Sequence, residues 1–237
     1  HFFASFGRVL RDFDRKAAMT RPHGLACYWH RADLVAELRR LWLATARGPI
    51  AASPAATDFV EKTPDHALWL DVVKELVPRA RIVHVVRDSR AVCASLLAAG
   101  RAPWGAAWAP KSLDAAIGVW RDHVGAVLAG APDAVVVRFE DLVQDPVSPM
   151  RALWNRLGLA AEDAALEEFR ERVRAAPAAA FRGTGDITTT PPEPEGFLAA
   201  PGRSREALGW FARRRVWRMT ADLMGRLGYD ESGRTFP

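Results

Sequence analysis

The sequence predicts an α/β fold, in which helices flank both faces of a central parallel sheet. Two runs rich in β-branched residues, 81–86 and 134–139, have the length of buried parallel strands. Segments with apolar residues at helical spacing lie before and after each run. Strands that alternate with helices are joined by crossover connections, which pair them in parallel.

The helices are expected where apolar residues recur every three or four positions. Ser148 and Pro149 open one of them and Gly158 closes it, because these residue types suit the N-cap, the first turn and the C-terminal end. Asp88 or Ser89 caps another, which follows the first long strand. The remaining expected helices cover residues 2–15, 31–44, 66–77, 113–128, 162–174 and 210–227.

A shorter strand is expected over residues 56–61, which end in β-favouring residues before Thr63-Pro64 breaks any helix. Residues 181–205 are rich in Gly, Pro and Thr without periodicity, and they predict a loop that acts as a lid. The length and composition allow one core, so residues 1–237 are expected to form a single domain.

The composition limits the function classes. The net charge is +5 and the pI about 9.7, which suits a polyanionic partner such as a nucleotide, a nucleic acid or an anionic surface. Cys27 and Cys93 match no metal spacing, and a buried apolar role is expected for each. The longest weakly polar stretch, 124–137, contains Asp133 and is too short to cross a bilayer, so we expect a soluble, cytoplasmic protein.

Polar residues follow each expected strand, at Glu61-Lys62-Thr63, Arg87-Asp88 and Glu140-Asp141. In open α/β sheets, ligands bind beyond these carboxyl ends. Ser95 lies seven positions after Asp88, and at about 100° per residue this returns it almost to the same helix face. Arg87 and Ser95 can therefore share a phosphate, although the pattern taken alone favours an ordinary capping salt bridge.

Several short motifs occur together in a fixed order. They are EKTP at 61–64, VVRDSR at 85–90 with SLL at 95–97, RFEDLV at 138–143 with DP at 145–146, LGL at 157–159, GW at 209–210 and LGY at 227–229. In order and spacing they resemble the bacterial and tyrosylprotein-type sulfotransferases that use 3′-phosphoadenosine 5′-phosphosulfate (PAPS). The resemblance implies a three-layer, P-loop-NTPase-like fold, transfer of a sulfuryl group to an acceptor hydroxyl, and no metal.

The resemblance also implies roles for individual residues. Arg87 and Ser95 would hold the 3′-phosphate of the cofactor, and Lys62 would donate to the oxygen that bridges sulfate and phosphate. Lys62 could instead be a solvated lysine paired with Glu61. Arg203 and Arg205 could close over the 3′-phosphate, or could simply be solvated. Arg90, which is rotated about 140° from Ser95 on the helix, is expected to be structural.

The acceptor side is less defined. Trp104, Trp108 and Trp120 could line an acceptor pocket, and core positions fit them equally well. A natural product, a carbohydrate or a lipid could supply the hydroxyl. His1 is a fallback candidate for the general base. The sequence favours a satisfied core position for His84 and the first turn of a helix for His66, and neither is assigned a catalytic role.

Two features depart from the family pattern. Phe139 stands where relatives often carry a tyrosine, which removes a hydroxyl near the cofactor. The strand, Pro-Arg-Ser-Gly-Thr-Thr type loop and helix with which the family begins have no equivalent in the sequence. We therefore expect roughly 30 or more residues to precede His1 in the intact protein.

Two other functions remain as alternatives. A nucleotide-dependent small-molecule kinase would need a GK[ST] loop and a magnesium carboxylate, which the sequence does not offer. A non-catalytic polyanion-binding module is favoured by the basic balance, but the arginines alternate with acidic residues along several helices, so no nucleic-acid partner is expected. The oligomeric state, including a homo-oligomer, is left open.

Overall fold

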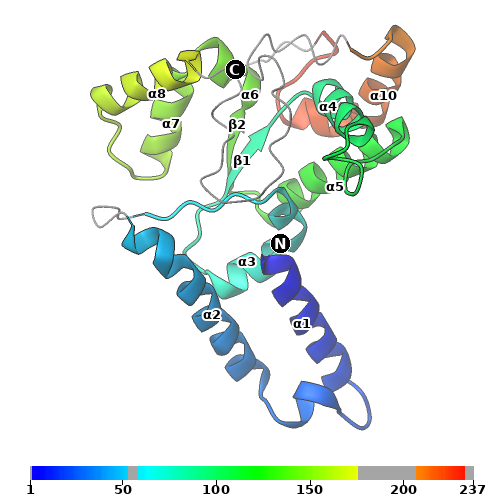
Figure 1. The fold of residues 1–237 in the computed structure, drawn as a ribbon, viewed down its shortest axis with the longest axis vertical. Helices are drawn as coiled ribbons and strands as arrows, with labels where there is room; N and C mark the ends of the chain where they lie inside the picture. Colours follow the sequence, from blue (N-terminus) through cyan, green and yellow to red (C-terminus); the bar gives the residue numbers. More distant parts are fainter. Residues whose placement is uncertain (1, 53–57, 176–206, 233–237) are drawn as a thin grey trace. The chain divides into compact units, whose positions relative to one another are not determined.

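The computed structural model describes residues 2–52, 58–175 and 207–232 (Figure 1). The chain divides into two compact units. The first contains the residues up to Arg81 together with Ala126–Pro132, and the second contains Ile82–Gly125 and the residues from Asp133 onward.

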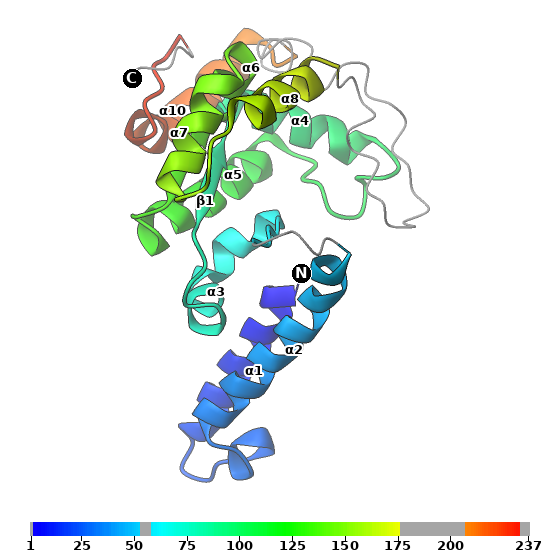
Figure 2. The same cartoon turned by 90° about the vertical axis from the view of Figure 1, so that its left-hand side faces the viewer.

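The first unit is built around two long helices, α1 (Phe2–Ala17) and α2 (Arg31–Ala51), which lie side by side (Figure 2). The short 3-10 helix η1 (Gly24–Cys27) lies between them in the sequence. Both long helices were expected from their apolar spacing, and both are confirmed. The large side chains that α1 buries recur every three or four residues: Phe3, Phe6, Leu10 and Phe13.

Residues 58–76, which follow α2 in the first unit, differ from the sequence prediction. The single helix expected over 66–77 is divided into a 3-10 helix, η2 (Pro64–Trp69), and α3 (Leu70–Leu76). Residues 58–63 form neither helix nor strand, so the strand expected over 56–61 is wrong for the part described. The physical reason is exposure: Val60 is 87% exposed and cannot belong to a buried strand.

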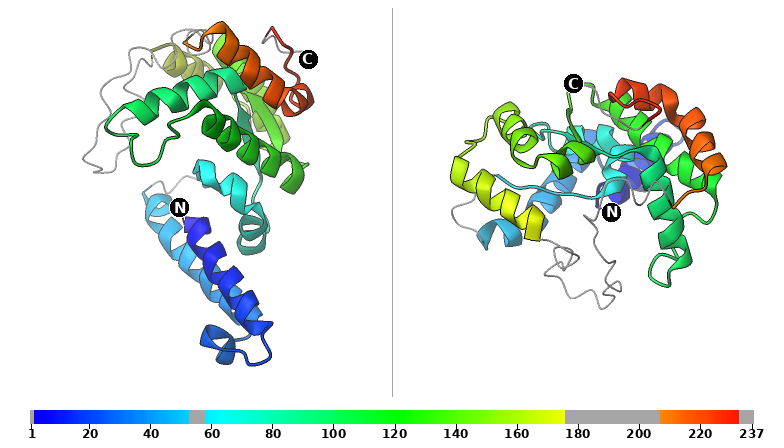
Figure 3. Two further views of the ribbon diagram at one scale, coloured as in Figure 1. Left: turned by 90° about the vertical axis from the view of Figure 1, so that its right-hand side faces the viewer. Right: turned by 90° about the horizontal axis from the view of Figure 1, so that it is seen from above.

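The second unit contains two parallel strands, β1 (Val83–Val86) and β2 (Val135–Arg138), paired so that Val86 lies opposite Arg138. On one side of the strands lie α4 and α10, and on the other lie α7 and α8 (Figures 1 and 3). The α/β class with parallel strands is thus confirmed, with two strands in the sheet of the described chain. The helices are α4 (Ser89–Arg101), α5 (Leu113–Gly130), α6 (Phe139–Gln144), α7 (Val147–Arg156), α8 (Asp163–Ala175) and α10 (Trp210–Arg226).

Two helix starts in the second unit differ from expectation. The helix α6 begins directly after β2 and was not predicted, because six residues are too few to show an apolar period. The start of α7 lies at Val147, ahead of the predicted Ser148. The reason is Asp145, whose carboxylate accepts from the backbone N–H of Val147 at 3.0 Å. Gly158 ends this helix as predicted, with a positive φ of 66° that favours glycine.

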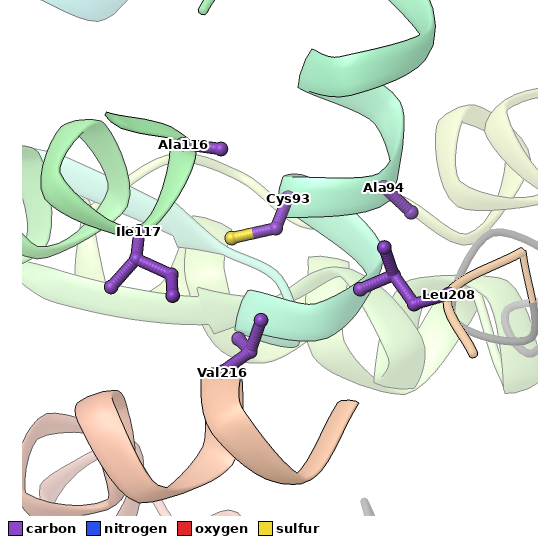
Figure 4. Close-up of a cluster of buried hydrophobic side chains, with 6 residues drawn as sticks. All are labelled: Cys93, Ala94, Ala116, Ile117, Leu208 and Val216. Carbon is purple, nitrogen blue, oxygen red and sulfur yellow. The ribbon is translucent and has the colours of Figure 1, made fainter. Parts of the chain in front are cut away.

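A small apolar core joins α4, α5 and α10 (Figure 4). Cys93 is fully buried within it, as expected, and burial raises the pKa of its thiol to about 12. The same expectation for Cys27 is wrong: η1 buries no side chain, and Cys27 is exposed. The residues of this core are Cys93, Ala94, Ala116, Ile117, Leu208 and Val216.

Candidate functional site

The ends of the two parallel strands bring two of the predicted polar segments together. Because Val86 pairs with Arg138, the next residues along the strands, Arg87 and Phe139, lie at the same edge of the sheet. The guanidinium carbon of Arg87 is 4.4 Å from the centroid of the Phe139 ring, within cation–π range. Phe139, which lacks the family's hydroxyl, thus gives Arg87 an apolar surface to lie against.

The backbone that carries Arg87 is held by side chains from elsewhere in the second unit. The indole Nε1 of Trp120 donates to the carbonyl of Arg87 at 3.2 Å. The N–H of Asp88 donates to Oε1 of Glu140 at 2.9 Å. Trp120 is buried, in agreement with the core position that was one of its two sequence interpretations.

Tyr229 supports Glu140 from the other side. Its hydroxyl donates to Oε2 of Glu140 at 2.7 Å and lies 3.5 Å from the carbonyl of Val86. Tyr229 is buried, and burial together with the charge of Glu140 raises its pKa, so the phenol keeps its proton. The sequence showed Glu140 as a strand-end residue and Tyr229 as part of a motif, but gave no sign that they meet.

The positive charge of Arg87 is partly balanced by two nearby carboxylates. Its guanidinium is half-buried, and burial lowers its pKa. The carboxylates of Glu140 and Asp88 act in the opposite direction. Because an arginine pKa lies so high, Arg87 stays positively charged. A phosphate that reaches Arg87 must therefore compete with these carboxylates.

Asp88 begins α4 and forms a buried ion pair with Arg90. Its Oδ1 accepts from the backbone N–H of Arg90 at 2.8 Å, which confirms Asp88 as the N-cap. Its Oδ2 lies 2.7 Å from Nη2 of Arg90, with both side chains less than a tenth exposed. Arg90 also donates to the carbonyl of Glu231 at 2.6 Å. The structural role predicted for Arg90 is confirmed.

Ser95 lies on α4, and it is exposed. Its hydroxyl is therefore open to a ligand, whereas the other serine of this helix, Ser89, is fully buried and bonded to Thr220 at 2.8 Å. Ser95 and Arg87 belong to the same unit. Their joint grip on a phosphate stays a prediction.

The segment around Lys62 belongs to the first unit, and neighbouring residues hold it. The hydroxyl of Thr63 donates to Oε1 of Glu61 at 2.8 Å, and Nδ1 of His66 lies 2.7 Å from Oε2. Both oxygens of Glu61 thus have partners other than Lys62, and the pairing of Lys62 with Glu61 is not seen among the described residues. The exposure of Lys62 still fits the solvated lysine of that alternative. Lys62 is exposed, and within 2–52, 58–175 and 207–232 it forms no ion pair.

The two candidate histidines lie in different surroundings. His66 lies in η2, with the Phe3 ring edge-on at 4.9 Å. Burial lowers its pKa, while the charge of Glu61 raises it. His84 lies inside β1 and is a core residue as expected, with a pKa lowered by burial. Its Nδ1 has no hydrogen-bond partner among the described residues, so the expected satisfied state is wrong.

Of the remaining candidates, two tryptophans are described by the structure and the others are not. Trp104 and Trp108 are 39% and 61% exposed, which rules out a core position and leaves the acceptor-pocket prediction standing. Their ring centroids are 5.6 Å apart. His1, Arg203, Arg205 and the predicted lid 181–205 lie outside the described residues.

The described residues show neither a metal-ligand cluster nor a membrane-spanning helix. In the part of the chain that the structure describes, no group of three or more His, Cys, Asp or Glu side chains could hold a metal ion. None of the described helices combines the length and the apolar character of a membrane span.

Comparison with known proteins places the chain in a family. Residues 6–163 match a family model described as "Sulfotransferase family", which is more than half of the 237-residue chain. The matched range contains Lys62, Arg87, Ser95 and Glu140. No curated protein and no solved structure matches the chain significantly.

Proposed function

The chain belongs to the sulfotransferase family and is a transferase of sulfuryl groups, and we propose that its donor is PAPS and its acceptor a hydroxyl group. One observation carries the proposal: Arg87 leaves the end of β1 directly before the start of α4, on a backbone that other side chains hold in place. A guanidinium at such a position suits a phosphate ester.

The start of α4 supports a bound 3′-phosphate in two ways. A helix N-terminus offers backbone N–H groups and a positive dipole end to an anion. The cap residue Asp88 would repel a phosphate, but Arg90 neutralises it in the buried ion pair. The exposed hydroxyl of Ser95 adds a donor on the same helix. Arg87 and Ser95 therefore fit the two roles that the family assigns to an arginine and a serine.

Lys62 is proposed to act on the leaving group. PAPS supplies a sulfuryl group activated by its 5′-phosphate. As the acceptor oxygen bonds to sulfur, the bond from sulfur to the bridging oxygen breaks, the electron pair stays with the phosphate, and the acceptor's proton leaves to a base. Negative charge therefore builds on the bridging oxygen, where the Lys62 ammonium stabilises it. Lys62 is exposed, and the neighbouring Glu61 is bound to Thr63 and His66.

The acceptor is proposed to be a natural product, a carbohydrate or a lipid with a free hydroxyl. Trp104 and Trp108 present exposed indole surface, against which an apolar ring or the face of a sugar can pack. Trp108 is oriented by a hydrogen bond from its Nε1 to the carbonyl of Trp104 at 3.2 Å. Arg203 and Arg205 remain proposed covers of the 3′-phosphate.

Titration calorimetry with 3′-phosphoadenosine 5′-phosphate (PAP), the product nucleotide, tests the proposal. Arg87→Ala removes charge-assisted hydrogen bonds and is expected to weaken PAP binding by roughly 10- to 100-fold. Ser95→Ala removes a neutral donor and should cost about 3- to 10-fold. Arg156→Ala, an exposed arginine at the end of α7, serves as the control and should bind PAP normally.

The result that contradicts the proposal is unchanged PAP affinity in both Arg87→Ala and Ser95→Ala. The two alternative functions have their own signatures in the same experiment. A kinase would bind Mg-ATP more tightly than PAP. A polyanion-binding module would bind heparin or RNA and show no saturable nucleotide site.

A further inference from the structure

A single peptide unit at the end of β1 is held at both of its polar atoms. The carbonyl of Arg87 and the N–H of Asp88 belong to the same planar peptide group. Trp120 binds the carbonyl and Glu140 binds the N–H, at 3.2 Å and 2.9 Å. A planar group held at both ends cannot rotate, and the preceding residue, Val86, is held by its pairing with Arg138 in the sheet. Together these restraints limit the direction in which the Arg87 side chain leaves the backbone.

The anchor on the N–H side is itself fixed. Glu140 follows β2 in α6, and its second oxygen accepts from the buried hydroxyl of Tyr229 at 2.7 Å. The raised pKa of Tyr229 keeps this hydroxyl a donor over the whole working pH range. The three residues form a chain from the C-terminal segment, through Glu140, to the backbone of Asp88.

We propose that Glu140, supported by Tyr229, is a positioning residue that aims Arg87 at the 3′-phosphate and thereby makes the enzyme prefer nucleotides that carry one. This inference rests on the proposed function, because it needs Arg87 to bind that phosphate. Glu140 itself does not touch the nucleotide. Its effect passes through the peptide unit between Arg87 and Asp88.

The charge of Glu140 provides a way to separate positioning from electrostatics. As a nearby carboxylate, Glu140 competes with a phosphate for Arg87. If it acted by charge alone, its removal would tighten phosphate binding in every variant. If it positions Arg87, removal of its hydrogen bonds weakens phosphate binding even though a competing charge is lost. The sign of the change therefore distinguishes the two roles.

Glutamine supplies the matched comparison with alanine. Glu140→Gln keeps an oxygen that can accept from the N–H of Asp88, and its amide can donate to Tyr229, whose oxygen can accept. It removes the charge and reverses the direction of the bond with Tyr229, while both contacts are kept. Glu140→Ala removes both hydrogen bonds and the charge together.

The experiment measures the affinity of each variant for PAP and for adenosine 5′-phosphate, which lacks the 3′-phosphate. Glu140→Ala is expected to lose roughly tenfold in PAP affinity while its affinity for adenosine 5′-phosphate is unchanged. Glu140→Gln should bind PAP at least as tightly as the unmodified protein. Tyr229→Phe should shift PAP affinity in the same direction as Glu140→Ala, but less.

The same measurement in the Arg87→Ala background shows whether Glu140 acts through Arg87. There, Glu140→Ala is expected to cause no further loss of PAP affinity, because the side chain it aims is gone. Retained binding of adenosine 5′-phosphate shows that each variant is folded. Glu140→Leu, which fills more of the vacated space, replaces Glu140→Ala if that variant does not fold.

The outcomes separate the two proposals. If Arg87→Ala weakens PAP binding but Glu140→Ala does not, only the positioning role is overturned. It is also overturned if Glu140→Ala weakens both nucleotides equally, or weakens PAP binding by the same factor with and without Arg87. If Arg87→Ala leaves PAP affinity unchanged, the proposed 3′-phosphate site fails, and the positioning role fails with it.

Discussion

The two polar segments expected to carry the chemistry are held in opposite ways. Residues 61–66, in the first unit, are held by their own neighbours: Glu61 binds Thr63 and His66. Residues 87–90, in the second unit, are held by side chains and a carbonyl that lie 33 to 141 positions away in the sequence. The hydrogen bonds of the first segment are local, although the Phe3 ring also packs against His66. A segment held from far away depends on the packing of its whole unit.

The ion pair in the second segment is also more deeply buried than the pair in the first segment. The side chains of Asp88 and Arg90 are 6% and 7% exposed, whereas those of Glu61 and His66 are 30% and 16% exposed. An ion pair in a dry interior is costly to break, because the remaining charge has no water to solvate it. A partly exposed pair loses far less. The two segments should therefore respond very differently to the loss of one carboxylate.

The largest expected effect is on the stability of the second segment. Asp88→Ala leaves the buried guanidinium of Arg90 without its carboxylate, which typically costs about 3–5 kcal/mol. Urea denaturation gives the change in the free energy of unfolding. The matched change in the first segment, Glu61→Ala, should cost about 1 kcal/mol or less. Equal losses in the two variants would remove the contrast between the segments.

The next largest effect concerns turnover at the first segment. Lys62→Ala is expected to lower kcat by about 10²- to 10³-fold with only a modest loss of PAP affinity, because the ammonium acts mainly in the transition state. Steady-state kinetics and calorimetry together test this. Lys16→Ala, which breaks a surface pair with Asp12, is the control and should leave both quantities unchanged. A loss of PAP affinity as large as the loss of kcat contradicts the role.

Much of this arrangement could be predicted from the sequence. The buried strand runs gave β1 and β2, and their parallel pairing placed Arg87 and Phe139 at one edge. Asp88 was recognisable as a cap because its residue type and its place after a strand are local features. Apolar spacing likewise gave the long helices. Each of these predictions depends only on residues that lie close together in the sequence.

What the sequence could not show is contact between distant residues. Nothing in the residues around Tyr229 indicates that its hydroxyl reaches Glu140, 89 positions earlier. The strand expected over 56–61 failed for a related reason: β-favouring residues form a strand only where a neighbouring strand and burial stabilise it. Exposure of Val60 depends on packing that local propensity does not encode.

A smaller effect is expected on the pH dependence of stability, to which His84 and His66 contribute differently. Burial lowers the pKa of His84 from its ordinary value of 6.5, so the folded state favours the neutral ring. The unfolded chain then binds a proton more readily, and stability is lost as the pH falls below about 6.5. His84→Leu should flatten this dependence between pH 7.5 and 5.5. His66→Leu should flatten it less, because Glu61 opposes the shift there.

The measurement for this prediction is the free energy of unfolding in urea at pH 7.5, 6.5 and 5.5. The aspartates with lowered pKa values, such as Asp145 and Asp222, titrate below their ordinary value of 3.8 and do not enter this range. If the free energy of unfolding of His84→Leu depended on pH as strongly as that of the unmodified protein, His84 would not be the source of this dependence.

The smallest effect is a difference in thiol reactivity. Cys27 in the first unit is exposed, whereas burial raises the pKa of Cys93 in the second unit to about 12. Iodoacetamide should therefore modify one thiol in the native protein and both in denaturant, as counted by mass spectrometry. Cys27→Ser should leave no reactive thiol in the native state. Rapid native modification of Cys93 would show that the core of the second unit opens readily.

A crystal structure of the protein with bound PAP would show directly whether Arg87 and Ser95 hold the nucleotide. We expect the 3′-phosphate to lie about 3 Å from the guanidinium of Arg87 and from the hydroxyl of Ser95, beside the N-terminal half of α4. We also expect the hydrogen bond from the N–H of Asp88 to Glu140 to be retained. A bound nucleotide whose 3′-phosphate contacts neither Arg87 nor Ser95 would show that the phosphate site lies elsewhere.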